Sequence, residues 1–496
     1  MSEYVVVMDC GATNAAVVAV DERGRVAASA SRPSAPVPQP GGQPDWLVWD
    51  LDEVWGKLGE ACAEVCAQVG RERVRAVAVT TFGADGAPLR PDGTLAYPVI
   101  SWQCPRTAAL ARSIGERMAP WEIYRLTGYQ VISFNTVLKF MWLRTHAPQA
   151  LEGTRWLMMA GLLGHRLCGE QSVDPTAACT TMAMDLGRRD WSRQMLDLAG
   201  VTPEWFPPWR EPGQVIGQVH SQAASRTGLP EGIPVVAAGH DTQFAIIGSG
   251  ATPAEAILSS GTWEILALRS DRFAPNREGY EQGLIIEADA VPGYWNPQML
   301  MIASGVLEWV RRHFWADHPE HEAMIAEAEA VAPGAGGVAV LPAFVEGVGP
   351  TKRLGALGTV AGLTITTSRA QVYRAALEGL AFQLRHALDI LRQATGVKPQ
   401  AIRIVGGGAR NRLWNQLRAE TTGLPVIALG QQEATVLGAA RFCQVATGIH
   451  CSLEAASQAA DTGAVTYEPT GQAEAYGRLY ERYLRLAEAA GKYYAP

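Results

Sequence analysis

The segment YVVVMDCGATNAAVVAV, residues 4–20, consists of two apolar runs joined by a short turn that contains a glycine. Both runs are rich in β-branched residues, so we predict a hairpin of buried strands, which the alternating segment 25–31 extends by a third strand. A tight turn of this kind points backbone N–H groups at one place, where an anion can be held. The hairpin is one of two in the chain, and the pair decides the predicted fold.

The second hairpin is AILSSGTWEILAL, residues 256–268, whose turn is again made of small residues. Helices and further strands follow each hairpin: a helix over 50–70 and a strand over 73–83 in the first half, and a helix over 368–391 and a strand–glycine–helix unit over 401–423 in the second. At 496 residues the chain exceeds what one core usually supports. We therefore expect an α/β chain of two similar domains, 1–243 and 244–496.

Composition excludes some classes of function. A formal charge of −7, with 48% hydrophobic and 18% charged residues, gives no basic surface for nucleic acid. No apolar segment reaches the roughly 18 residues that span a bilayer, and no signal segment opens the chain, so we expect a cytoplasmic protein with no membrane partner. The cysteines form no CxxC pair, which favours reduced structural thiols; they are Cys10, Cys62, Cys66, Cys104, Cys168, Cys179, Cys443 and Cys451.

The first turn, DCGATN, offers polar groups for a phosphate. Thr13 and Asn14 add short donors to the backbone, and Asp9 at the end of its strand could hold a hydrated Mg²⁺. An ordinary hairpin turn has the same residue types, so the turn alone leaves both interpretations open.

Two further glycine-containing turns complete a possible nucleotide site. The hairpin turn presents Ser260, Gly261 and Thr262, and three glycines in IVGGGARN, residues 404–411, follow a strand and open a helix. Bare backbone lets a flat ligand lie close, with its phosphates near a helix N-terminus. Neither GxGxxG nor GxxxxGK[ST] occurs, which argues against a Rossmann or P-loop site. A plain strand-to-helix turn is the alternative.

His240 and Asp241 stand together in the apolar segment AAGHDTQFAIIGSG, residues 237–250, at the expected domain junction. Asp241 could simply cap a helix that begins at Thr242. It could also be the general base that takes a proton from a substrate hydroxyl during attack on the γ-phosphate of ATP.

In the first domain, Asp85, Trp102 and Arg106 follow apolar strands and could contact a polyol, although a turn and a core tryptophan would explain them equally well. Lys139, in a helix entered near Asn135, is expected to be a surface residue.

Taken together, these motifs resemble the FGGY carbohydrate kinases over residues 4 to 450. DCGATN and SSGTW resemble the two phosphate loops of the family, VGGGARN its adenosine motif, FNTVLKFMWL and AALEGLAFQL its signatures, and GHD its catalytic segment. The resemblance implies a two-domain actin/hexokinase-like (ribonuclease H-like) fold with a cleft between the domains, and a phosphoryl transfer that uses ATP and Mg²⁺.

Carried over position by position, the resemblance implies Asp241 as base and Asp9 as the organiser of Mg²⁺. The residues expected near ATP are Ala12, Thr13, Asn14, Ser260, Gly261, Thr262, Gly407, Gly408 and Asn411. Those expected near the sugar are Gly83, Asp85, Trp102, Arg106, His240, Thr242, Gln243, Glu264 and Asn296.

The stretches ISWQCPRTAA, AGHDTQFA and ASGVLEWVR most resemble family members that phosphorylate the ketose L-fuculose. Cys104 stands where many members carry an aspartate, which argues against a glycerol- or xylulose-type pocket. A related ketose such as L-rhamnulose, or a non-catalytic sensor of sugar and nucleotide, is the alternative. Whether the chain forms a homo-oligomer stays open.

Overall fold

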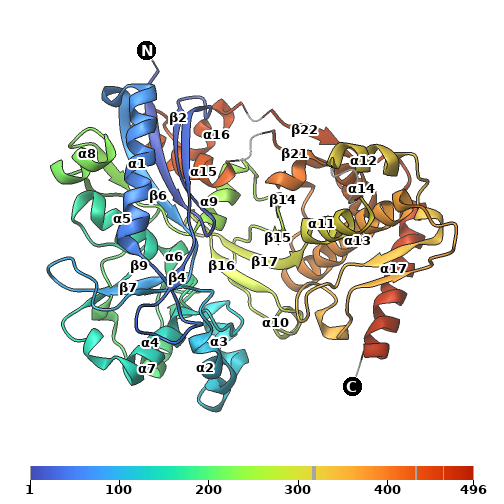
Figure 1. The fold of residues 1–496 in the computed structure, drawn as a ribbon, viewed down its shortest axis with the longest axis horizontal. Helices are drawn as coiled ribbons and strands as arrows, with labels where there is room; N and C mark the ends of the chain where they lie inside the picture. Colours follow the sequence, from blue (N-terminus) through green and yellow to red (C-terminus); the bar gives the residue numbers. More distant parts are fainter. Residues whose placement is uncertain (1, 316–319, 431–432, 462, 495–496) are drawn as a thin grey trace.

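The computed structural model describes residues 2–315, 320–430, 433–461 and 463–494. The first half of the chain builds a six-stranded sheet in the order β12-β13-β6-β1-β2-β3 (Figure 1). Its strands are β1 (Tyr4–Cys10), β2 (Asn14–Asp21), β3 (Val26–Pro33), β6 (Val74–Thr81), β12 (Val215–Gln218) and β13 (Pro234–Val236). The predicted first hairpin and third strand are confirmed. The strand expected over 233–241 is shorter, because residue 241 already begins a helix.

The second half builds a seven-stranded sheet in the order β16-β17-β15-β14-β20-β21-β22. Its strands are β14 (Glu255–Ser260), β15 (Trp263–Ala267), β16 (Ile285–Ala288), β17 (Trp295–Ile302), β20 (Ala401–Val405), β21 (Val426–Ala428) and β22 (Val465–Tyr467). In each sheet an antiparallel hairpin carries a third antiparallel strand on one side and two parallel strands on the other. The similar order of strands expected for the two halves is confirmed.

Helices make up much of the rest of both halves. They are α1 (Leu51–Val69), α2 (Ala108–Ser113), α3 (Pro120–Thr127), α4 (Thr136–His146), α5 (Met159–Cys168), α6 (Pro175–Cys179), α7 (Arg193–Ala199), α8 (Ser221–Thr227), α9 (Asp241–Gly248), α10 (Arg277–Glu281), α11 (Ser304–Phe314), α12 (His321–Glu329), α13 (Arg369–Thr395), α14 (Arg412–Thr422), α15 (Ala434–Ala446), α16 (Leu453–Ala459) and α17 (Ala473–Tyr494). Asp50 caps α1, and a capping box at Ser368 starts α13, so the helices predicted over 50–70 and 368–391 are confirmed.

Short strands complete the two halves: β4 (Val37–Pro38), β5 (Leu47–Trp49), β7 (Gly86–Leu89), β8 (Val99–Ile100), β9 (Arg155–Met158), β10 (Met184–Asp185), β11 (Asp190–Trp191), β18 (Ala339–Leu341) and β19 (Thr359–Ala361). The described residues contain no helix long and apolar enough to cross a bilayer.

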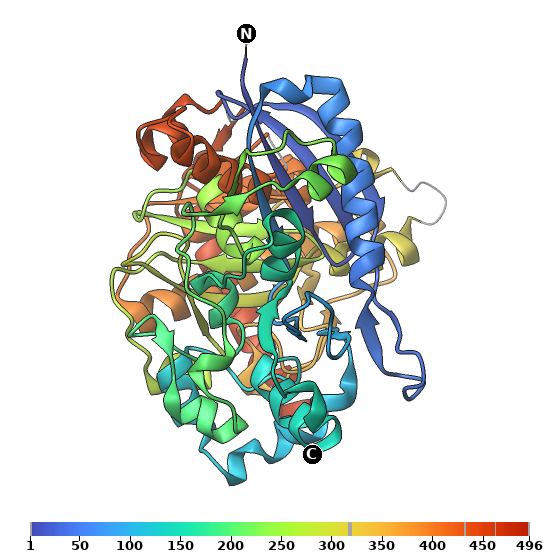
Figure 2. The same ribbon diagram turned by 90° about the vertical axis from the view of Figure 1, so that its left-hand side faces the viewer.

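Strand β1 shows why the first sheet is apolar on both faces. Val6 and Met8 pack in the cluster that includes α1, whereas Val5 and Val7 pack in the cluster that includes α15. A strand buried on both faces reads as a continuous apolar run, which is the pattern of residues 4–8. Helix α15 comes from the far end of the chain, and Figure 2 shows this orange-red segment beside the blue N-terminal strands.

Helices α9 and α15 cross between the two sheets at two glycines. A Cβ atom on Gly248 would collide with the carbonyl oxygen of Ala434, and one on Gly438 with that of Phe244. The backbones therefore touch, which only glycine permits. On its other side α9 packs on the second sheet, through Ile246. The expected boundary between residues 243 and 244 lies inside α9 and stays a prediction.

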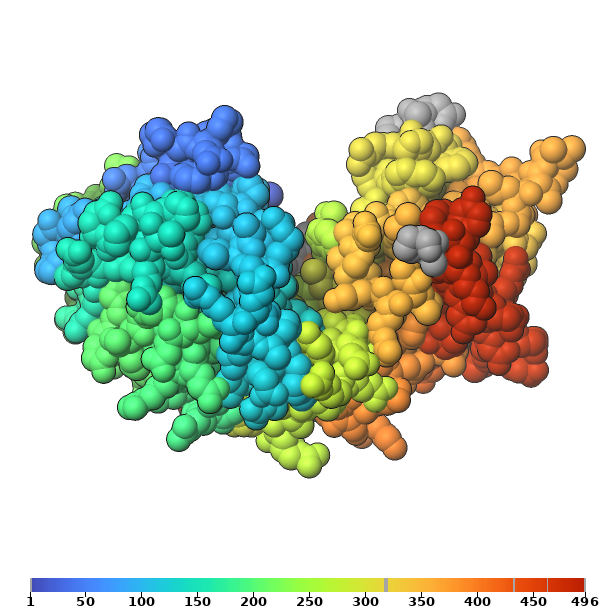
Figure 3. All heavy atoms as spheres, turned by 90° about the horizontal axis from the view of Figure 1, so that it is seen from below, coloured from blue at the N-terminus to red at the C-terminus, as the bar shows by residue number. Residues whose placement is uncertain are grey.

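The two lobes enclose a cleft. Figure 3 shows it as a hollow between the blue-to-green N-terminal lobe and the yellow-to-red C-terminal lobe. The turns of both hairpins, the start of α9 and the glycine-rich turn after β20 bear many of the candidate site residues, although they lie far apart in the chain. The predicted α/β architecture of two domains with a cleft between them is confirmed.

Candidate active site

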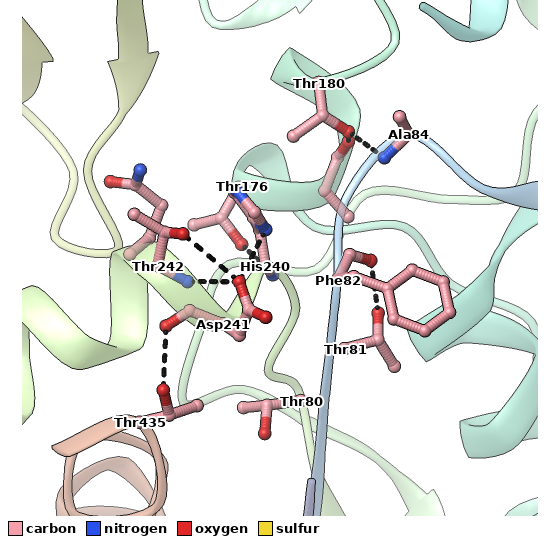
Figure 4. A network of polar contacts seen from close by, with 12 residues as sticks. Thr80, Thr81, Phe82, Ala84, Thr176, Thr180, His240, Asp241, Thr242 and Thr435 are labelled. Atoms are coloured by element: carbon pink, nitrogen blue, oxygen red, sulfur yellow. Dashed lines mark hydrogen bonds and ion pairs between the residues drawn. The ribbon is translucent and has the colours of Figure 1, made fainter. Parts of the chain in front are cut away.

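Asp241 is the first residue of α9, and its side chain is 32% exposed. Its Oδ1 atom accepts hydrogen bonds from the backbone N–H of Thr242 at 2.6 Å and from the Thr242 hydroxyl at 3.2 Å (Figure 4). The helix dipole favours a negative charge at this end of α9. The capping alternative is wrong in the form expected, because His240 and not Asp241 occupies the cap position.

His240 lies between two carboxylates. Its Nδ1 atom is 3.1 Å from Asp241 Oδ1, in ion-pair range without hydrogen-bond geometry, and its Nε2 atom is 3.7 Å from Glu287 Oε1. Burial lowers the pKa of His240, but the charges of Glu287 and Asp241 outweigh this effect and raise the pKa to about 9. The imidazole is therefore a cation at neutral pH.

A cavity of about 310 Å³ opens beside these residues, and we call it the central cavity. Its size is at the lower end of the roughly 300–1,000 Å³ typical of small-molecule sites. Both halves of the chain line it: Phe82, Gly83, Ala84, Trp102, Tyr129, Phe134, Thr180, His240 and Thr242 from the first, and Ile265, Ile285, Glu287, Gln298 and Leu300 from the second. Four of the expected sugar contacts, Gly83, Trp102, His240 and Thr242, are thus brought together.

Glu287 on β16 is buried in the wall of this cavity, and three neighbours donate hydrogen bonds to it. The Tyr129 hydroxyl donates to Oε1, the Gln243 amide donates to Oε2, and the Gln298 amide donates to Oε2 at 2.8 Å. Gln243 does not line the cavity, contrary to its expected place beside the sugar. Its side chain acts indirectly, through its hydrogen bond to Glu287. Glu287 was absent from the sequence prediction.

Asp9 lies at the end of β1 in a second cavity of about 320 Å³, the Asp9 cavity. Gly11, Thr13, Asn14 and Glu433 share it, while Ala12 packs toward the core instead. The Thr80 hydroxyl donates to Asp9 Oδ1 at 2.7 Å. Burial, and then the charge of Asp241, raise the pKa of Asp9 to about 7, although the Thr80 bond lowers it. A carboxylate held among other carboxylates is stabilised by a cation.

The residues at Asp9 fit Mg²⁺. No group of three or more His, Cys, Asp and Glu side chains that could hold a metal ion is found in the described parts of the chain. Mg²⁺ does not require such a cage, because it commonly uses one or two carboxylates together with water and substrate phosphates. Asp9, with Thr13 and the turn at Gly11 beside it, offers that donor set.

A third cavity, of about 760 Å³, lies along the glycine-rich segments of the second half, and we call it the glycine cavity. It brings together the expected nucleotide residues Gly261, Thr262, Gly407, Gly408 and Asn411. A Cβ on Gly407 would meet nothing within 4 Å, so its backbone faces open space that a flat ligand could fill. These groups fit a nucleotide, since they combine bare backbone, the polar hairpin turn and the start of α14.

Ser260 and Glu264 support this cavity from beneath. Ser260 lies directly under Gly408, where a Cβ would collide with its hydroxyl. The hydroxyl donates to Glu264 Oε1 at 2.7 Å, and Arg418 of α14 pairs with the same carboxylate and donates to Ser260 Oγ at 2.9 Å. Glu264 is fully buried in this network and does not reach the central cavity, contrary to its expected place beside the sugar.

Asp85 and Lys139 form a buried ion pair behind the central cavity. Lys139 Nζ is 2.5 Å from Asp85 Oδ1 and also donates to the carbonyl oxygens of Ala84 and Ile100. The Trp49 indole N–H and the backbone N–H of Trp102 donate hydrogen bonds to Asp85 Oδ2. The surface position expected for Lys139 is wrong, because the lysine neutralises a carboxylate that would otherwise be buried alone.

Arg106 and Asn296 also lie outside the cavities. The Arg106 guanidinium bonds Gln39 and Tyr97, stacks on Trp46 and donates from Nε to Cys104 Sγ at 3.0 Å. Asn296 is buried and donates to Asp289 Oδ2 at 3.1 Å. Neither side chain lines the central cavity, so the structure does not bring them to the other expected sugar contacts.

Comparison with known proteins agrees with this geometry. Residues 4–248 match the N-terminal domain, and residues 256–447 the C-terminal domain, of the FGGY family of carbohydrate kinases. The chain belongs to the FGGY family of carbohydrate kinases. Of the two hypotheses left open by the residues, kinase and non-catalytic sensor, family membership supports the ATP-dependent carbohydrate kinase.

Individual FGGY relatives cover nearly the whole chain. It is 40% identical to the L-fuculokinase of Escherichia coli strain K12, across 89% of this chain and 92% of the relative. It is 35% identical to the L-fuculokinase of Haemophilus influenzae, across 91% and 97%. The solved structure of xylulose kinase from Rhodospirillum rubrum shares the fold, with a TM-score of 0.87 at 24% identity and coverage of 99% of both chains.

Several residues of this FGGY site escape sequence reasoning. Glu287, Gln298, Ile285 and Leu300 lie on β16 and β17, whose local sequence is that of any apolar strand. Tyr129 lies in an ordinary loop after α3. Only the packing of these strands against the first half of the chain brings them to the cavity. Glu287 alone carries a usable signal, a charge in the apolar run LIIEADA.

Proposed function

We propose that this FGGY kinase transfers the γ-phosphoryl group of ATP to the 1-hydroxyl of L-fuculose, with Asp241 as general base. The products are L-fuculose 1-phosphate and ADP. One observation carries the proposal: Asp241 begins α9 next to His240 and Thr242, which line the central cavity, and its charge raises the pKa of Asp9 in the Asp9 cavity. The L-fuculokinase relatives support the choice of sugar.

The chemistry assigned to Asp241 follows from its position. As the sugar oxygen attacks the γ-phosphorus, the O–H bond breaks, and a carboxylate within reach takes the proton. The N-terminus of α9 and the donors of Thr242 favour the ionised form before the reaction. His240, a cation at neutral pH, and Thr242 are suited to hold the neighbouring sugar oxygens in line.

The remaining residues hold the nucleotide. We assign the triphosphate to the two hairpin turns, which contain Thr13 and Thr262, and the adenosine to the backbone of Gly407 and Gly408. Asp9 would hold Mg²⁺ through water, and the bound ion would neutralise charge on the phosphates. Asp9 must be ionised for this role, which a cation beside it would favour.

A panel of ketoses tests the proposal. Purified protein with Mg·ATP should phosphorylate L-fuculose with the highest kcat/KM among L-fuculose, L-rhamnulose, D-ribulose and L-xylulose, as measured by coupled release of ADP. A higher kcat/KM on L-rhamnulose would select the alternative ketose, and no turnover of any of the four would contradict a ketose kinase. The free cysteines of the described chain agree with the cytoplasm, where we expect the enzyme to act in L-fucose breakdown.

A further inference from the structure

The second-half wall of the central cavity is one face of three neighbouring strands. Ile265 on β15 lies opposite Leu300 on β17, and Ile285 on β16 lies opposite Gln298 on β17. Because side chains alternate along a strand, Gln298 and Leu300 point to the same face, as do Ile285 and Glu287. All five line the central cavity. These five side chains therefore form one continuous patch on the sheet, which we call the patch.

The patch divides into a polar and an apolar part. Glu287 and Gln298 are hydrogen-bonded to each other, and Glu287 lies 3.7 Å from His240, so the polar part adjoins the candidate base. Ile285 is one strand repeat away from Glu287, roughly 7 Å along β16. With Ile265 and Leu300 it forms a corner of three aliphatic side chains, which we call the aliphatic corner.

The aliphatic corner is open to the cavity. Leu300 is 41% exposed although its strand β17 has a paired strand on each side, and Trp102 across the cavity is 37% exposed. Apolar surface gains roughly 25 cal/mol per Å² when it leaves water. The three side chains of the corner contain no hydrogen-bonding atom. A ligand that fills this corner therefore binds best if the part that lies there is hydrocarbon.

We propose that the aliphatic corner of Ile265, Ile285 and Leu300 receives the C6 methyl group of a 6-deoxyketose and makes the enzyme discriminate against ketoses with a hydroxyl at C6. The inference rests on the proposed function, and it adds the residues that select the substrate class. With C1 at Asp241, the polar part of the patch serves the middle hydroxyls, and C6 reaches the corner. A C6 hydroxyl there would lose its hydrogen bonds to water without gaining a partner.

Two matched pairs of sugars isolate the effect of C6. L-Fuculose is 6-deoxy-L-tagatose, and L-rhamnulose is 6-deoxy-L-fructose, so each pair differs by one oxygen atom. The kcat/KM of the deoxy sugar should exceed that of its hydroxylated partner about 100-fold in both pairs, which is the usual limit for rejection of a hydroxyl by an apolar pocket. Ratios near one would overturn the inference while phosphorylation of the sugars left the proposed function standing. No phosphorylation of any of the four would instead contradict the proposed function.

Substitution within the corner provides the second test. Leu300→Asn, a change of similar size at a partly exposed position, should lower the deoxy-to-hydroxy ratio about tenfold, mostly by improving L-tagatose relative to L-fuculose. Leu300→Met should keep the ratio, because it stays apolar. Leu363→Asn makes the same chemical change at an exposed leucine outside the cavity and should leave the ratio unchanged.

A ratio that is equal in Leu300→Asn and wild type would contradict the assignment of the corner to C6. Ile285→Thr gives an independent variant, with a hydroxyl introduced from the neighbouring strand, and it should shift the ratio in the same direction. Thermal unfolding of each variant establishes that the protein compared is folded. The ratio of two substrates on one protein does not change when only the folded fraction changes, which separates a role in specificity from a role in stability.

Discussion

At the scale of single residues, Asp241 is set apart by what surrounds it. Three buried carboxylates of this region are held by other side chains: Asp85 by Lys139, Glu264 by Arg418, and Glu287 by Tyr129 and two amides. Asp241 has Thr242 and the His240 imidazole beside Oδ1 and the dipole of α9, and unlike those three carboxylates its side chain is partly exposed. A carboxylate that is ionised and accessible is the kind that can accept a proton from a substrate.

Asp241→Asn tests this role. The amide keeps the size of the side chain and can still accept from Thr242, but it cannot accept the sugar proton, so kcat should fall about 10²–10⁴-fold while the KM for ATP changes little. Steady-state kinetics measure both quantities. Asp197→Asn, at an exposed position of α7, is the matched control and should retain the wild-type rate. An undiminished kcat in Asp241→Asn would rule out the mechanism.

The charge of His240 predicts a pH dependence of stability. Its pKa is raised from the ordinary 6.5 to about 9 in the folded state, so folding gains from its protonation. This contribution is complete below pH 6.5 and disappears as the pH rises through 9, a loss on the order of 3 kcal/mol. The Tm of the wild type should therefore fall more steeply between pH 6.5 and 9.5 than that of His240→Gln. Parallel Tm profiles for the two proteins would contradict the assignment.

Sequence reasoning found residues whose role is visible within one short motif. Asp9, Thr13 and Asp241 stand in turns or at element ends where a local pattern is informative, and the structure gathers them near one another. Lys139 and Glu264 were misjudged because each depends on a partner more than 50 residues away. A local sequence pattern carries no information about a partner so far away in the chain. Glu287 was missed for the same reason, because its partner Tyr129 is also distant in the sequence.

At the scale of elements, the hairpins were predictable and the helix crossings were not. Residues 4–20 and 256–268 contain their own pairing partner, so alternation and a glycine turn suffice. The contact of α9 with α15 joins segments almost 200 residues apart, and its only trace in the sequence is a glycine in each helix. In the sequence alone, Gly248 and Gly438 are simply residues of low helix propensity, and only the crossing explains why glycine is needed there.

Gly438→Ala tests the crossing. The added methyl group would press on the Phe244 carbonyl, so the free energy of unfolding should fall by about 1–3 kcal/mol or more, despite the better helix propensity of alanine. Gly477→Ala in α17 is the matched control: its Cβ would meet nothing within 4 Å, and the change should stabilise by up to about 1 kcal/mol. Urea denaturation of both variants gives the comparison, and equal effects of the two substitutions would contradict a backbone contact.

At the scale of the whole molecule, the two lobes and the cleft between them imply closure on ligand binding. The central cavity takes its lining from both lobes, and the candidate nucleotide residues lie on the turns of both. Water competes with the sugar for the phosphoryl group, so exclusion of water by closure serves the reaction. The exposed Leu300 and Trp102, from opposite lobes, would then be covered together.

Small-angle scattering measures this closure. The radius of gyration should decrease when L-fuculose and a nonhydrolysable ATP analogue are both present with Mg²⁺, and it should decrease less with either ligand alone. The wild-type protein without ligand is the reference, and a mixture with L-fuculose replaced by a non-substrate sugar is the control. An unchanged radius with both ligands bound would argue against domain closure as part of the cycle.

The crossing of α9 and α15 also decides which atoms stay still during such a motion. Helix α15 packs on the sheet of the first lobe, α9 packs beside it there and reaches the sheet of the second lobe through Ile246, and the two helices touch backbone to backbone. Asp241 is the first residue of α9 and follows a strand of the first sheet, so it lies close to the junction of the two lobes. When two lobes close about a shared contact, atoms near that contact move less than atoms at the far ends of the lobes. The carboxylate of Asp241 can thus keep its position while closure brings both substrates toward it.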